Sequence, residues 1–281
     1  MTRGLVVNAD DFGRSRGVSA GIVEAHLHGL VSTTTALVNL PGALDDVAQA
    51  AQQAPVLGLG VHLNLTLGRP IAARQSVASL LTPTGTFLPP DELAARVERV
   101  DPTEVAREWR AQIEAFRSTG ASLDHLDSHH HVALLSPAWW AIILDLAAEF
   151  RCGVRPPAPA DPRDDVLFSR FPVAARHFAA GEATALRVAR GVPCPDRFAT
   201  RFYGRQATLE TLLAVLEGVT QGATELMCHP GRVDEVLLTE SGYAQERELE
   251  LMILTSAPAR QAVRRLAIDR GTYRQLVSTS V

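Results

Sequence analysis

Residues 123–131 read LDHLDSHHH and place two aspartates and four histidines within nine positions. The stretch begins as a buried strand does, with apolar Leu123 and Leu126, and an apolar run resumes at Val132. Imidazole and carboxylate groups are the ligands that divalent metals favour where no thiolate is offered. Because the whole chain has only nine histidines, four of them in one nonapeptide indicate a metal or catalytic site at the end of a strand.

Strand-like and helix-like segments alternate on both sides of this stretch. Strands are expected at 4–8, 33–38, 57–65, 123–131, 152–155, 198–203 and 224–228, and helices at 17–29, 43–54, 91–117, 137–150, 173–185, 208–221, 243–255 and 257–269. This order predicts an α/β fold with mainly parallel strands, and over 281 residues a (β/α) barrel-like architecture is favoured over a doubly wound open sheet. We expect a single domain over 1–281, with an irregular excursion at 156–198 that is rich in Pro, Ala and Arg.

Composition excludes several classes of protein. A net charge of −4 provides no electrostatic footprint for nucleic acid, and no segment has the ~18 uninterrupted apolar residues of a membrane span. The three cysteines are widely spaced, which indicates neither a disulfide framework nor a CxxC zinc site. No GxGxxG, P-loop or GxSxG motif is present. We therefore expect a cytoplasmic protein without a nucleic-acid or membrane partner.

Ionisable residues lie at the C-terminal ends of several of the expected strands. They are Asp10, Asp11, His62, Asp127 to His131, Arg155 and His229. The carboxyl ends of parallel strands meet at one edge, where the connecting loops converge and catalytic groups collect. The sequence therefore predicts that these side chains form one site.

One carboxylate and two imidazoles leave open positions on a metal for water or substrate. Two adjacent aspartates on an extended backbone point in different directions, so we expect one to bind the metal and the other to act as a base. Asp11 is favoured as the ligand and Asp10 as the base, although their spacing does not order them. His229 is expected to be a general acid, and Arg155 to keep the basic aspartate ionised. The set indicates metal-assisted hydrolysis.

Seven stretches resemble the YdjC-type carbohydrate deacetylases, most closely their chitooligosaccharide deacetylase branch. They are VNADDFG at 7–13, STTTALVN at 32–39, GVHLNLTLGRP at 60–70, LDSHHHV at 126–132, FYG at 202–204, MCHP at 227–230 and LTSA at 254–257. The resemblance spans nearly the whole chain. It implies a barrel-like deacetylase fold and removal of an acetyl group from N-acetylglucosamine oligomers such as diacetylchitobiose.

The resemblance also assigns roles to individual residues. It implies one divalent metal ion, Zn²⁺ or Mg²⁺, and the two nitrogen ligands favour Zn²⁺. The implied metal ligands are Asp11, His62 and His129. The implied catalytic residues are Asp10 as the base and His229 as the acid, and Arg155 is expected beside the base from its position at a strand end. The expected substrate-binding residues are Asn64, Tyr203 and His131. A homodimer is expected on resemblance alone.

Two departures from the family pattern concern the substrate. Relatives commonly continue the histidine triplet as HHHVH, whereas Ala133 occupies the last of these positions here. The excursion at 156–198 is also longer and richer in Pro and Arg than expected. Hydrolysis of a glycolipid head group, as in hopanoid-associated relatives, and a non-catalytic sugar- or metal-binding role therefore remain alternatives. Glycoside hydrolysis by two carboxylates fits the histidine cluster less well.

Overall fold

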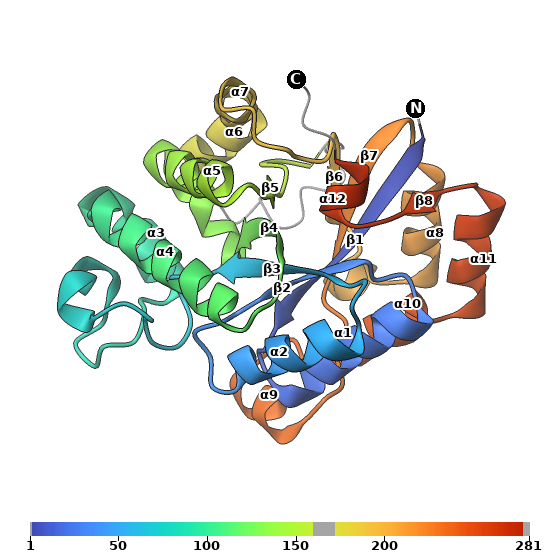
Figure 1. Cartoon of the computed structure of the whole chain (residues 1–281), viewed down its shortest axis with the longest axis horizontal. Helices are drawn as coiled ribbons and strands as arrows, with labels where there is room; N and C mark the ends of the chain where they lie inside the picture. The colour runs from blue at the N-terminus through green and yellow to red at the C-terminus, as the bar shows by residue number, and fades with distance from the viewer. Residues whose placement is uncertain (1, 160–171, 278–281) are drawn as a thin grey trace.

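The structure, a computed structural model, describes residues 2–159 and 172–277, and its centre is an eight-stranded sheet (Figure 1). The strands are β1 Arg3–Phe12, β2 Thr33–Ala36, β3 Gly58–Leu63, β4 Leu123–Ser128, β5 Gly153–Val154, β6 Arg197–Ala199, β7 Gly222–Cys228 and β8 Asp269–Arg270. Their order is β5-β4-β3-β2-β1-β7-β6, with β8 beside β1. Every pairing is parallel.

The sheet curls into a half-barrel, which confirms the barrel-like α/β prediction. Its path ends at β5 and β6, and these two strands are not paired with each other within 2–159 and 172–277. Because all strands run the same way, the residues that follow them share one edge. The fold thus places the candidate site residues at one end of the half-barrel.

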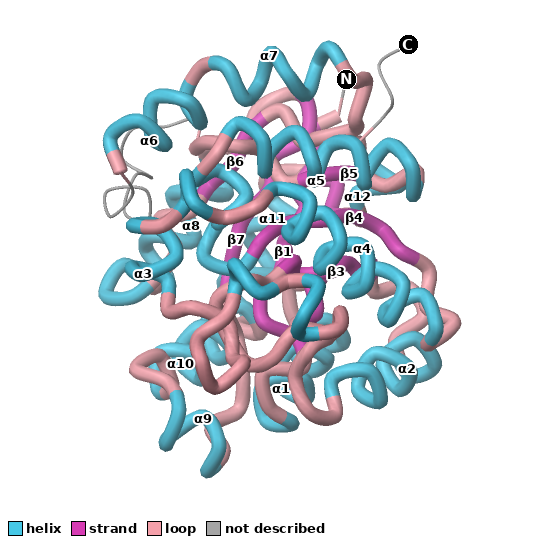
Figure 2. The backbone as a smooth tube through the Cα atoms, turned by 90° about the vertical axis from the view of Figure 1, so that its left-hand side faces the viewer, coloured by secondary structure: helices cyan, strands magenta, loops and turns pink. Residues whose placement is uncertain are grey.

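Helices surround the strands, as Figure 2 shows. They are α1 Arg16–His28, α2 Ala43–Gln53, α3 Pro90–Ala95, α4 Pro102–Ser118, α5 Pro137–Phe150, α6 Val173–Ala180, α7 Glu182–Ala189, α8 Leu209–Glu217, α9 Glu235–Glu240, α10 Gln245–Leu254, α11 Ala257–Arg265 and α12 Tyr273–Leu276. Several begin at a side chain that caps the first turn: Ser15, Asp101 and Ser136 each accept a hydrogen bond from a backbone N–H of the helix that follows.

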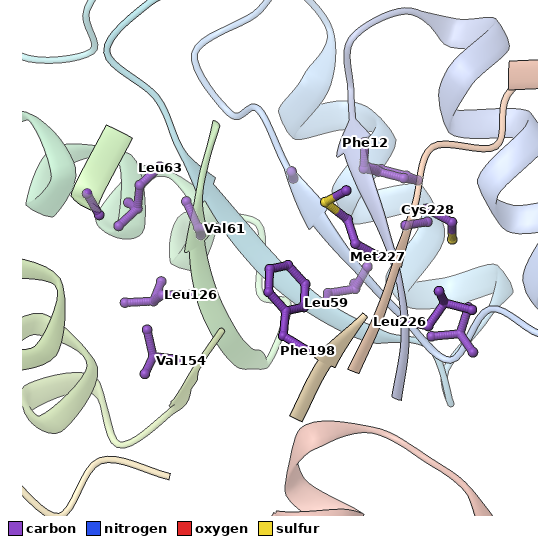
Figure 3. Close-up of a cluster of buried hydrophobic side chains, with 14 of the residues drawn as sticks. Phe12, Leu59, Val61, Leu63, Leu126, Val154, Phe198, Leu226, Met227 and Cys228 are labelled. Atoms are coloured by element: carbon purple, nitrogen blue, oxygen red, sulfur yellow. The ribbon is translucent and has the colours of Figure 1, made fainter. Parts of the chain in front are cut away.

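The core lies between the strands and these helices. Figure 3 shows Val61, Leu126, Val154, Phe198 and Leu226, which come from five different strands of the sheet. Each of these side chains is almost completely buried. Their transfer out of water is the main driving force for closing the layers on one another, and it makes the sheet a rigid support for the residues at its edge.

Two of the expected helices are wrong as single elements. The segment 91–117 divides into α3, a 3-10 helix at Val97–Arg99, and α4. The division occurs because Asp101 caps a new helix and Pro102, which has no N–H to donate, occupies its first turn. The segment 173–185 divides into α6 and α7, which meet at Gly181. The central part of the expected excursion, 160–171, lies outside the described residues.

The ends of some strands also differ from expectation. The histidine stretch is not a strand to its end, since β4 stops at Ser128 and a 3-10 helix spans His129–Leu135. The expected strand at 198–203 is shorter than predicted, because β6 ends at Ala199. The elements α9, β8 and α12 were not predicted. β8 lies beside the first half of β1, where Gly4 pairs with Asp269, because β2 pairs only with the second half.

No single helix in 2–159 or 172–277 is long and apolar enough to cross a membrane. The 3-10 helix His129–Leu135 and α5 pass the same test only when taken together, and they meet at a bend of 110°.

Candidate metal centre and active site

A cavity of about 280 Å³ lies at the edge of the sheet where the strands end. Its lining includes Asp10, Asp11, His62, His129, His131 and His229, which lie within or directly after the carboxyl ends of four different strands. Arg155 is next to this cavity rather than in its lining, and reaches it through hydrogen bonds to Asp10. The structure therefore brings the predicted cluster of ionisable residues together.

The backbone at Asp11 differs from the expectation for two adjacent aspartates. Asp11 has a φ of +70° and lies where the pairing of β1 with β2 slips between Ala9 and Phe12. A bulge of this kind re-aims side chains, and Asp is among the residues that tolerate a left-handed backbone. Both carboxylates consequently approach His62 Nε2, with Asp11 Oδ1 at 3.4 Å and Asp10 Oδ2 at 4.0 Å. The two side chains therefore do not point in different directions as expected, because the backbone at Asp11 is not extended.

Asp11, His62 and His129 form a set that fits a metal ion. Their ligand atoms all lie within 4.8 Å of one another, and all three residues are buried. Asp11 Oδ1 is 3.4 Å from His62 Nε2 and 3.1 Å from His129 Nδ1, yet among the described residues it has no hydrogen bond of good geometry. A buried carboxylate oxygen left without a donor costs free energy, which a bound cation would offset. In composition the set matches the 2-His-1-carboxylate triads that bind divalent metals.

His62 is oriented by a second carboxylate behind it. Its Nδ1 lies 2.6 Å from Asp127 Oδ1, which leaves Nε2 directed at Asp11. Burial by itself would lower the pKa of His62, but the charge and hydrogen bond of Asp127 outweigh burial and raise it. A carboxylate behind a metal-binding histidine is a common arrangement that fixes the ring and its tautomer. For His129, burial is dominant and lowers the pKa, so this ring is neutral near pH 7.

A second group of potential ligands, made of Asp10, His62 and Asp127, shares His62 with the first. Arg155 already binds both of its carboxylates, with two hydrogen bonds of 2.7 and 2.6 Å to Asp10 and an ion pair of 2.9 Å to Asp127. Since the guanidinium neutralises these oxygens, the first group fits a cation better.

Asp10 is held as an anion. Burial would raise its pKa, but Arg155 outweighs that effect and lowers the pKa of Asp10 far below its usual range. Asn8 adds a further hydrogen bond of 2.9 Å to Oδ1. An ionised carboxylate in a fixed orientation, next to a metal site but outside its ligand set, has the position required of a general base.

His229 approaches the same carboxylate from β7. Its Nε2 lies 3.9 Å from Asp10 Oδ2, and its buried Nδ1 has no hydrogen-bond partner in 2–159 or 172–277. Burial lowers the pKa of His229 to about 4, so the ring is neutral near pH 7. Tyr203, which also lines the cavity, packs edge-on against this ring at 5.2 Å and stacks on Tyr243 at 4.7 Å.

The other two predicted substrate-binding residues differ in position. His131 lines the cavity on a turn in which His130 and His131 have positive φ angles of 52° and 53°. Asn64 is fully buried and is not part of the cavity lining. Its amide donates to Asn39 Oδ1 and the Leu67 carbonyl. The predicted substrate contact of Asn64 therefore has no support, because its polar atoms hold the loop after β3. Ala133, at the departure from the family pattern, is also buried.

Sequence reasoning missed Arg247. This α10 residue lines the cavity and donates from Nη2 to Asp11 Oδ2 at 2.5 Å, while its buried Nη1 has no hydrogen-bond partner among the described residues. Arg247 comes from a helix rather than from a strand end, and no motif marks it.

Glu225 was missed as well, although the sequence contains a signal for it. A carboxylate in the buried run of β7 needs a partner, and Arg155 Nε supplies one at 2.8 Å.

Glu250 was also missed, and it makes stability depend on pH. This α10 carboxylate is fully buried and accepts hydrogen bonds of 2.5 Å from the His229 backbone N–H and the Tyr243 hydroxyl. Burial raises the pKa of Glu250 to about 7. Between the ordinary carboxyl pKa and this value the folded chain holds a proton that the unfolded chain releases. The contribution of Glu250 to stability is therefore lost as pH rises through that window.

We expect Glu250→Gln to remove this pH dependence. The free energy of unfolding of the wild type, minus that of the variant, is expected to fall by about 2 kcal/mol between pH 5 and pH 7. Urea unfolding of both proteins at pH 5 and pH 7 measures this difference in the free energy of unfolding. Parallel pH profiles of the two proteins would show that Glu250 does not titrate in this range.

Comparisons with known proteins identify relatives that span nearly the whole chain. A family model described as YdjC-like protein matches residues 4–265. A carbohydrate deacetylase of Brevibacillus brevis is 36% identical over 277 residues, which cover 97% of this chain and 99% of that protein. A chitooligosaccharide deacetylase of Yersinia enterocolitica is 34% identical, with coverage of 97% and 99%. A solved structure from Enterococcus faecalis V583, described as a candidate cellobiose-phosphate cleavage protein, has a TM-score of 0.86 at 33% identity and covers 99% of this chain and 100% of that chain.

Proposed function

The chain belongs to the YdjC-like protein family, and from this we propose that it is a carbohydrate deacetylase that hydrolyses the N-acetyl group of N-acetylglucosamine oligomers such as diacetylchitobiose. The observation that carries the proposal is the position of Asp10. This ionised carboxylate lies between the potential metal ligands Asp11, His62 and His129 on one side and His229 on the other.

The ligand set would hold one divalent ion. When bound there, the ion supplies a Lewis acid that polarises the acetyl carbonyl and lowers the pKa of a bound water. Two imidazole nitrogens among three ligands support a borderline ion such as Zn²⁺ over Mg²⁺, which prefers oxygen.

Asp10 would take a proton from the attacking water, because it is ionised and Arg155 fixes both of its oxygens. His229 is neutral in the resting cavity, so it would receive this proton from Asp10 across the 3.9 Å gap and pass it to the departing amine. One proton thus moves from water to the amine nitrogen while the C–N bond breaks, and the products are a free amino sugar and acetic acid, which releases its proton to leave acetate.

The remaining residues of the cavity would position the sugar. The stacked pair of Tyr203 and Tyr243 offers aromatic faces, which pack against the C–H surface of sugar rings. Arg247 Nη1 is a fixed donor without a partner in the described part of the chain, since the Nε and Nη2 of Arg247 are held by the Tyr243 carbonyl and by Asp11. It is suited to a substrate oxygen.

The test is release of acetate from diacetylchitobiose by the purified chain loaded with Zn²⁺ or Mg²⁺. We expect stoichiometric acetate and loss of one acetyl group in the mass of the sugar. Protein that holds about one metal ion per chain but releases no acetate from a panel of N- and O-acetylated sugars and glycolipids would overturn the proposal. Cleavage of the glycosidic bond instead would point to the reaction for which the Enterococcus faecalis structure is named.

The role of His229 has its own prediction. We expect His229→Ala to lower kcat for diacetylchitobiose by about 100-fold, because the amine must be protonated to leave. The loss should be much smaller for 4-nitrophenyl acetate, whose phenolate leaves without a proton. His28→Ala, at an exposed position at the end of α1, is the matched control. Equal losses on both substrates would exclude His229 as the acid.

A further inference from the structure

A closed ring of buried polar side chains connects Asp10 with Tyr273, the first residue of α12. Tyr273 is 1% exposed and lies after residue 265, where the match to the family model ends. Two separate routes lead from it to Asp10, one through its hydroxyl group and the other through its ring.

The first route is a chain of charge-assisted hydrogen bonds. The Tyr273 hydroxyl donates to Glu225 Oε2, and Glu225 Oε1 accepts from Arg155 Nε at 2.8 Å. The two remaining nitrogens of Arg155 hold Asp10 at 2.7 and 2.6 Å. Because a guanidinium is planar and rigid, the carboxylate at its Nε side determines how its other side presents to Asp10.

The second route passes through His125 and Asn8. The Tyr273 ring stacks on His125, with centroids 4.0 Å apart and an angle of 7° between the planes. His125 Nε2 lies 3.0 Å from Asn8 Oδ1, and Asn8 Nδ2 donates to Asp10 Oδ1 at 2.9 Å. Since the Asn8 amide donates to Asp10, its oxygen must be the acceptor, which makes His125 Nε2 the donor.

The backbone at the start of α12 is also held in place, by the neighbour of a ring member. The Tyr273 and Arg274 N–H groups donate to the two oxygens of Asp124 at 3.1 and 3.2 Å. Asp124 precedes His125 in β4 and is buried. The start of α12 is thereby tied to the strand that carries the stacking partner of Tyr273, so its hydroxyl has little freedom to move away from Glu225.

The Tyr273 hydroxyl group affects the charge balance around Arg155. Arg155 faces three buried carboxylates, those of Asp10, Asp127 and Glu225. Burial raises the pKa of Glu225, while Arg155 and the Tyr273 hydroxyl favour its ionised form. Without that hydroxyl, Glu225 would bind the proton more readily and release Arg155 Nε, and the guanidinium could turn toward the other two carboxylates.

We propose that Tyr273 is a positioning residue for Asp10, acting through Glu225 and Arg155, so that the C-terminal helix completes the geometry of the reaction site. The inference rests on the proposed role of Asp10 as the base. It assigns a function to a segment that contributes no residue to the cavity lining.

The test compares Tyr273→Phe with Glu225→Gln and with the double variant. Tyr273→Phe keeps the ring on His125 and removes only the hydroxyl. We expect kcat for diacetylchitobiose to fall about tenfold, with KM and metal content little changed, as for other outer residues that orient an active group. The double variant should be no slower than Glu225→Gln alone, since both changes break the same route.

Glu108→Gln is the matched control, because Glu108 is also a fully buried carboxylate but holds the backbone N–H groups of Ile71 and Ala72, outside the ring. If kcat fell as much in Glu108→Gln as in Tyr273→Phe, the loss in both variants would be due to general destabilisation, and the proposal would be overturned. Additive losses in the double variant, or a loss confined to KM, would also overturn the proposal.

A second readout does not depend on activity. The side-chain N–H signal of Arg155 Nε in an NMR spectrum, identified by its absence in Arg155→Lys, should shift and exchange faster with solvent in Tyr273→Phe but not in Glu108→Gln. An unchanged signal would overturn the coupling. If the wild type releases no acetate, the proposed function fails, and this signal alone decides whether Tyr273 controls Arg155.

Discussion

Asp10→Asn is expected to lower kcat for deacetylation by about 1,000-fold or more while leaving the metal in place. The loss follows because an amide cannot accept the proton of the attacking water, and general bases contribute factors of about 100 to 10,000. The metal should stay because Asp11, His62 and His129 are untouched. The side chain keeps its size, and Arg155 retains Asp127 and Glu225 as partners, so the variant should fold.

Acetate release and metal content, measured on the same preparation, check this prediction. Asp145→Asn is the matched control, because Asp145 is an exposed α5 residue that pairs only with Arg190 among the described contacts. Turnover within a factor of a few of the wild type would remove Asp10 as the base.

Asp11→Asn is expected to abolish both metal binding and turnover. Replacing Oδ1 or Oδ2 by an amide nitrogen takes away the one anionic ligand of the set, and metal affinity should fall by more than the ~10–100-fold typical of outer partners. Asn is suited to the test because it tolerates the left-handed backbone at this position, where φ is +70°. Loss of the carboxylate also leaves the buried Arg247 without its ion-pair partner, so some loss of stability should accompany the change.

Metal content after dialysis against a chelator and reloading with Zn²⁺ or Mg²⁺ measures this effect. The thermal midpoint of the metal-free protein shows how much of the change is loss of stability. The two aspartate variants together decide between the overlapping ligand groups, which share His62. If Asp10→Asn lost the metal and Asp11→Asn kept it, the ion would lie with Asp10 and Asp127, and the roles of the adjacent aspartates would be reversed.

The parts of the site that could be predicted are those that follow strands directly. Asp11, His62 and His129 lie at three strand ends, and a parallel sheet brings such positions to one edge whatever the details of packing. The fold class was predictable for the same reason, since alternating strands and helices leave few other arrangements. Errors in the helices came from local breaks, such as Asp101–Pro102 and Gly181, that a hydrophobic pattern passes over.

The amino-acid sequence by itself determined which chemistry the chain can perform, because carboxylates and imidazoles are encoded at the strand ends. The tertiary structure decided which carboxylate has which partner. Arg155 neutralises Asp10, Arg247 binds Asp11, and Tyr273 reaches Glu225 across 48 residues. These pairings join residues distant in the sequence, and their strength comes from removing the groups from water, which happens only when the layers close. These pairings therefore cannot be predicted from the residues adjacent in the sequence.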